Sequence, residues 1–105
     1  MIRHIVLVRF AEGVTDAGKQ EIYDALGALR GHLPGVLDFH HGPNVSVEGP
    51  MTKGYQDGFW FDFTDAEARN TYLDDPGHKA AGAKLVAAAE GGREGLVVFD
   101  IELPS

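Results

Sequence analysis

The fold is decided by the stretch YQDGFWFDFTDAEARNTYLDDPGH, residues 55–78. Alternate positions of 55–63 share a face that carries four aromatic rings, which is the period-two pattern of a strand with one apolar side. Thr64 and Glu67 then form a capping-box pattern that predicts the start of a helix. Asp75-Pro76 interrupts that helix, because the residue before a proline avoids the helical conformation, and the same pair suits the first positions of a new helix. The stretch therefore predicts a strand, a short helix and a sharp break before a second helix.

The rest of the chain adds three strands and one helix around this stretch. Residues 2–10, 36–41 and 96–103 are rich in β-branched and apolar residues and predict strands. Thr15 is a good N-cap for a helix that runs to about Arg30, and the helix after Pro76 should end at Gly91-Gly92. The order β-α-β-β-α-α-β is typical of a single α+β domain over residues 1–105. We expect a ferredoxin-like, four-stranded antiparallel sheet with helices on one face.

The predicted strands are apolar on both sides. Residues 5 and 7 oppose residues 6, 8 and 10 in the first strand, and the last strand shows the same two-sided pattern. Helices on one face cannot cover the other, so a second copy of the sheet is the simplest cover. We therefore expect a homodimer through the sheet faces, a dimeric α+β barrel.

Composition excludes several classes of partner and chemistry. The net charge is −7, which argues against nucleic acid and anionic membrane surfaces, because both bind basic patches. The absence of cysteine removes disulfides and thiolate sites. The run Ile5–Val8 is too short for a signal sequence or a membrane span, so a cytoplasmic location is the expectation.

Four residues form a predicted proton-transfer site. His78 falls in the first turn of the last helix, where the helix dipole favours the neutral imidazole that a general base needs. Tyr72 lies just before the proline break and is the predicted hydroxyl donor to an enolate. His4 and Asp57 should enter the same pocket from the sheet. Each residue also has a structural alternative. His78 could be a histidine bonded to the helix end and Tyr72 a core aromatic. His4 could be a hydrogen-bonded core histidine and Asp57 a carboxylate at a solvated strand end.

The sequence contains no pattern that predicts a cofactor. His40 and His41 are neighbours in a strand and point to opposite faces, so they cannot share a metal. His4, Asp57 and His78 would form a two-histidine, one-carboxylate triad, but no short ligand spacing supports it. No glycine-rich phosphate loop follows a strand.

Residues 1–10, 33–46, 53–78 and 96–104 together resemble the stress-responsive A/B barrel domain (Dabb) family. The resemblance implies a ferredoxin-like protomer and a homodimer through the sheets. A characterised polyketide cyclase of that family closes its substrate without a cofactor, using a histidine and a tyrosine that match His78 and Tyr72. Its first-strand histidine matches His4, whereas Asp57 stands where the cyclase has another pocket histidine.

Two functions of different classes follow from these residues and the resemblance. One is a cofactor-independent cyclase or lyase-like enzyme that acts on a small apolar or polyketide-like substrate. The other is a non-catalytic dimeric stress-response or ligand-binding protein. A cofactor-independent monooxygenase is a third hypothesis, which rests on fold analogy alone.

Overall fold

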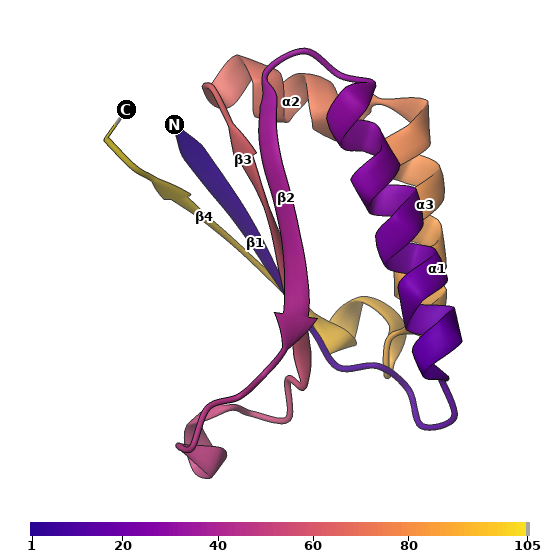
Figure 1. Ribbon diagram of the computed structural model, residues 1–105. Helices are drawn as coiled ribbons and strands as arrows, with labels where there is room; N and C mark the ends of the chain where they lie inside the picture. Colours follow the sequence, from indigo (N-terminus) through magenta and orange to yellow (C-terminus); the bar gives the residue numbers. More distant parts are fainter. Residues whose placement is uncertain (105) are drawn as a thin grey trace.

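A computed structural model describes residues 1–104 and has the predicted order of strands and helices (Figure 1). The strands are β1 (Ile2–Val8), β2 (Val36–Pro43), β3 (Asp57–Phe63) and β4 (Leu96–Glu102). The helices are α1 (Asp16–Gly27), α2 (Ala66–Asp74) and α3 (Pro76–Ala88), and three short 3₁₀ turns follow α1, precede β3 and precede β4. The sheet is antiparallel with the order β2-β3-β1-β4, so the ferredoxin-like prediction is confirmed.

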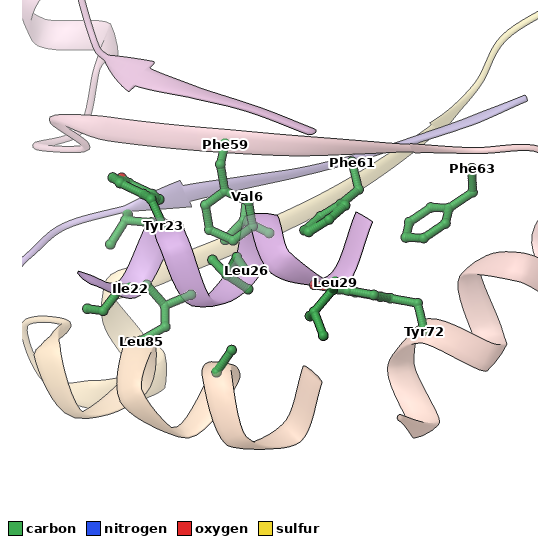
Figure 2. Packing of buried hydrophobic residues seen from close by; sticks show 12 residues of the cluster. Val6, Ile22, Tyr23, Leu26, Leu29, Phe59, Phe61, Phe63, Tyr72 and Leu85 are labelled. Atoms are coloured by element: carbon green, nitrogen blue, oxygen red, sulfur yellow. The ribbon is translucent and has the colours of Figure 1, made fainter. Parts of the chain in front are cut away.

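The helices pack on one face of the sheet, and the core lies between the two layers (Figures 1 and 2). Phe59, Phe61 and Phe63 point from β3 toward the helices, as the alternation of this strand predicts. Leu26 of α1 and Leu85 of α3 meet them from the other layer. Burial of these large apolar side chains is the main force that holds the helices against the sheet.

The edge strand β4 is the least covered part of the sheet. It pairs only with β1, and its side chains after Leu96 are exposed, including Val98, which is 61% exposed. The chain ends meet at one end of this strand pair, where the amino group of Met1 donates to the carbonyl of Leu103 at 3.1 Å. The space on the helix side of β4 is therefore open rather than filled by a helix.

One predicted helix cap is wrong by one residue. Asp65, not Thr64, caps α2, and its carboxylate accepts from the amide of Ala68 at 2.8 Å. Thr64 instead lies in the link directly after β3, where its amide donates to the carbonyl of Gly35 at 2.9 Å. Gly35 has φ +81°, and a Cβ there would lie 2.5 Å from that of Ala68, so only glycine allows this close approach. The tertiary contact with Gly35 thus shifts the start of the helix.

The predicted break before α3 is confirmed. Asp75 is extended, and its side chain accepts from the amides of Gly77 and His78 at 2.8 and 3.2 Å. Pro76 occupies the first helical position, where its missing N–H costs nothing. The break turns α3 relative to α2, so residues on either side of it can face each other.

Candidate active site

A cavity of about 740 Å³ opens between the edge of the sheet and helices α2 and α3. This volume lies within the usual range for small-molecule pockets. The lining is mostly apolar and includes Val6, Leu26, Phe59, Leu85 and Val86. Its polar lining groups include His4 of β1, Tyr72 of α2, His78 of α3 and Asp100 of β4, together with Lys79 and Arg93. Three of the four predicted site residues therefore line one pocket.

Tyr72 and His78 face each other across the proline break. Their ring centroids lie 4.2 Å apart with an interplanar angle of 49°. Tyr72 is 1% exposed and reaches from α2 into the layer between helices and sheet (Figure 2). Burial raises the pKa of the Tyr72 hydroxyl well above its usual value, so it stays protonated at neutral pH. The pair combines a proton-bearing phenol with an imidazole.

His78 has the properties of a neutral base. Burial is the main cause that lowers its pKa below 6.5, and the neighbouring His4 and Lys79 add to this, while Asp75 opposes it. Its Nδ1 atom is buried and has no hydrogen-bond partner among the described residues. A neutral imidazole has one ring nitrogen with a free electron pair, so it can accept a proton.

His4 is held by a carboxylate that sequence reasoning missed. Its Nδ1 lies 2.6 Å from Asp100 Oδ1, and Asp100 Oδ2 accepts from Arg69 at 3.1 Å. Because a carboxylate can only accept, Nδ1 carries the proton and Nε2 remains free. The register of the sheet explains the contact, since His4 of β1 lies directly opposite Asp100 of β4. A lone carboxylate in the apolar run 96–101 was the signal that could have found it.

The prediction that Asp57 enters the same pocket is wrong. Asp57 lies at the first position of β3, opposite Val8, whereas His4 lies opposite Phe61. Four residues along a strand correspond to roughly 13 Å. Asp57 instead pairs with Lys19 of α1, with 3.1 Å between Nζ and Oδ2. The correct face was predicted for this carboxylate, but the position along the strand puts it beyond reach of His78.

Within residues 1–104 no group of three histidine, cysteine, aspartate or glutamate side chains is placed to hold a metal ion. In the same part of the chain, no helix has the length and apolar character needed to cross a membrane. A cytoplasmic location stays a prediction.

Comparison with known proteins identifies relatives over nearly the whole chain. The family model described as Stress responsive A/B Barrel Domain matches residues 2–103. A dimeric ferredoxin-like protein of unknown function from Jannaschia sp. CCS1 is 33% identical, covers 97% of this chain and 98% of its own, and has a TM-score of 0.89. No curated protein matches significantly.

More distant solved structures share the fold. A protein from Arabidopsis thaliana is 24% identical, with coverage of 100% of this chain and 97% of its own and a TM-score of 0.88. The hydroxynitrile lyase from Passiflora edulis is 16% identical, with coverage of 98% and 93% and a TM-score of 0.84. At these identities the likeness extends to the fold alone.

Proposed function

The chain belongs to the stress-responsive A/B barrel domain family, and we propose that it is a cofactor-independent enzyme that moves a proton on a small apolar carbonyl compound. The reaction is of the cyclase or lyase type, in which a carbon–carbon bond forms or breaks next to the carbonyl. The observation that carries the proposal is the His78–Tyr72 pair, with rings 4.2 Å apart, in a cavity of about 740 Å³.

In this proposal His78 is the general base. Its neutral imidazole takes a proton from the carbon next to the carbonyl, and the electron pair of the broken C–H bond moves into an enolate. Tyr72 donates a hydrogen bond to the developing enolate oxygen, which is most effective in an apolar, water-poor lining. In a cyclase the enolate carbon then attacks a second carbonyl, and the resulting alkoxide takes the proton back from His78. In the reverse, lyase direction His78 removes the hydroxyl proton, the carbon–carbon bond breaks to give the enolate, and His78 returns the proton to the enolate carbon.

His4 has a supporting role in this scheme. Asp100 fixes its Nδ1 proton and ring orientation, which leaves Nε2 available near the reacting atoms. Its ring centroid lies 5.9 Å from that of Tyr72, so it is close enough to hold the substrate or a second proton. We assign His4 to substrate orientation and Asp100 to the positioning of His4.

The experiment measures proton exchange and bond cleavage on simple probes. Wild-type protein should accelerate the exchange of the α-hydrogens of 2-heptanone in D₂O, or the retro-aldol cleavage of 4-hydroxy-4-methyl-2-pentanone, above the buffer rate. His78→Gln should remove about 10²-fold of that acceleration, and Tyr72→Phe about tenfold or more. Circular dichroism and thermal unfolding of both variants serve as the control for folding. Buffer rates on both probes with wild-type protein would contradict the proposal.

A non-catalytic ligand-binding protein is the second candidate. It is favoured by the packing of Tyr72, which is among the most buried side chains and belongs to the hydrophobic core. Such a protein would bind 2-heptanone in the same pocket, with chemical shifts of α3 amides as the readout, and would show no exchange above the buffer rate. The same pair of measurements thus separates the two candidates.

We also propose that the chain forms a homodimer through the face of the sheet that the helices leave uncovered. That face carries partly or largely exposed apolar side chains, among them Leu7, Val97, Phe99 and Ile101. The related Jannaschia protein is described as dimeric. Light scattering at micromolar concentration should give the mass of a dimer, and Phe99→Asp should abolish it, because an unpaired charge in an apolar interface is costly. A wild-type monomer would contradict the proposal.

A further inference from the structure

We propose that the pocket selects substrates with an anionic group, a carboxylate or a phosphate, joined to the apolar carbonyl body. Lys79 and Arg93 are the residues that select it. The inference rests on the proposed function for the reaction at His78, but the binding preference is measured independently of that reaction. Both cations line the cavity and are exposed, so they lie where the cavity meets solvent.

These two cations stand out in the charge balance of the chain. The chain has nine lysine and arginine residues. Most of their side chains are used internally, either in ion pairs or, for Arg9, in a hydrogen bond to the carbonyl of Glu94. Within residues 1–104 the side chains of Lys53, Lys79 and Arg93 have neither kind of partner. Two of these three line the same pocket.

The negative charge of the pocket lining is already neutralised. Asp100 is the one carboxylate in the lining, and both of its oxygens are occupied, by His4 at 2.6 Å and by Arg69 at 3.1 Å. The lining therefore has a net positive character in a protein whose net charge is −7. The protein as a whole repels anions, but two unpaired cations at one opening create a local positive potential. This potential favours the binding of an anionic group there.

The positions of the cations relative to His78 suggest how a substrate lies. Lys79 directly follows His78 near the start of α3, and Arg93 follows the end of this helix. The helix from Lys79 to Ala88 is roughly 14 Å long. The small residues Gly82, Ala83 and Ala87 line the cavity between the two cations. An anionic group at Arg93 therefore lets an apolar chain extend along α3 to the His78–Tyr72 pair, whereas one at Lys79 binds beside the reacting carbonyl.

The test compares three probes with the same eight-carbon chain: octanoate, octyl phosphate and neutral 1-octanol. Isothermal titration calorimetry should show that wild-type protein binds at least one anion about tenfold or more tightly than 1-octanol. The double variant Lys79→Gln with Arg93→Gln should lose about threefold in affinity per removed charge for that anion, about tenfold in all, with 1-octanol unchanged. The matched control is Lys53→Gln with Lys84→Gln, which removes the same charge outside the pocket and should change affinity less than twofold.

The outcomes distinguish a carboxylate from a phosphate. They also distinguish a failure of this inference from a failure of the proposed function. Preference for octanoate identifies a carboxylate, and preference for octyl phosphate identifies a phosphate. Equal binding of 1-octanol and both anions by wild-type protein overturns the inference, as does full retention of anion affinity in the pocket variant. Anion preference without proton exchange overturns the proposed function alone. Proton exchange without anion preference overturns this inference alone.

Discussion

Two clusters in the layer between sheet and helices contain the same residue types in different surroundings. The pocket cluster consists of His4, Tyr72, His78 and Asp100. The far cluster, at the opposite end of the sheet, consists of Lys19, Tyr23, His41 and Asp57. Each contains a histidine ring against a tyrosine ring, with centroids 4.2 Å apart in the pocket cluster and 4.1 Å in the far cluster. Ring contact alone therefore does not distinguish an active site from core packing.

The difference lies in space and charge. The pocket cluster borders a cavity of about 740 Å³, and burial lowers the pKa of His78. In the far cluster His41 is exposed to solvent, Asp57 is paired with Lys19, and the two adjoining hollows are smaller, about 300 and 470 Å³. A base needs a desolvated, neutral imidazole beside room for a substrate. Only the pocket cluster has both, and this comparison makes the far cluster a built-in control.

The largest expected effect is on catalysis. His78→Ala should lower the rate of α-hydrogen exchange on 2-heptanone by about 10²-fold or more, because the general base is lost. His41→Ala removes the matching histidine of the far cluster and should change the rate by less than about twofold. Exchange is measured by NMR in D₂O. Equal losses in the two variants would show that both clusters act only through stability.

The exchange rates of the Asp100→Asn and Asp57→Asn variants should differ by about tenfold. Asp100→Asn leaves His4 without the acceptor that fixes its ring, so we expect about a tenfold lower rate and a changed pH profile. Asp57→Asn removes a carboxylate that contacts Lys19 rather than the pocket, so both the rate and the profile should stay the same. An Asp100→Asn profile identical to that of wild-type protein would assign this residue to stability alone.

The substitution Tyr23→Phe tests the far cluster through its effect on the stability of the protein. Its hydroxyl is buried and has no hydrogen-bond partner among the described residues, and burial together with Asp57 raises its pKa. A buried hydroxyl without a partner is destabilising, so Tyr23→Phe should raise the free energy of unfolding by about 1 kcal/mol. Urea denaturation with an unchanged slope measures this. A loss of stability would reveal a partner for the hydroxyl.

The smallest effect is a pH dependence of stability that comes from His78. Its pKa in the folded protein lies below 6.5, so the unfolded chain binds protons more readily as the pH falls. Stability should therefore be complete above pH 6.5 and decrease as the pH falls below it. His78→Gln should make the dependence between pH 7 and pH 5 shallower. Unfolding curves across this range provide the measurement.

Local sequence signals predicted the elements and part of the site. Asp75 and Pro76 determine the start of α3, because a cap and a fixed φ act within one helical turn. The alternation of Phe59, Phe61 and Phe63 determines which face of β3 is buried, since successive side chains point to opposite sides. Both signals involve neighbours in the chain, so they needed no tertiary structure. They also placed Tyr72 and His78 on the two sides of one break.

Only the tertiary structure decided which charges meet. Asp100 reaches His4 across 96 positions of the chain, because β1 and β4 pair in one particular register. Asp57 has the predicted face but pairs with Lys19, because strand length separates it from the pocket. The helix cap is Asp65 rather than Thr64, because the amide of Thr64 is held by the carbonyl of Gly35 just after β3. Residue types and periodicity determined the layers of this protein, whereas the register between distant strands determined its chemistry, since register depends on contacts that no local pattern encodes.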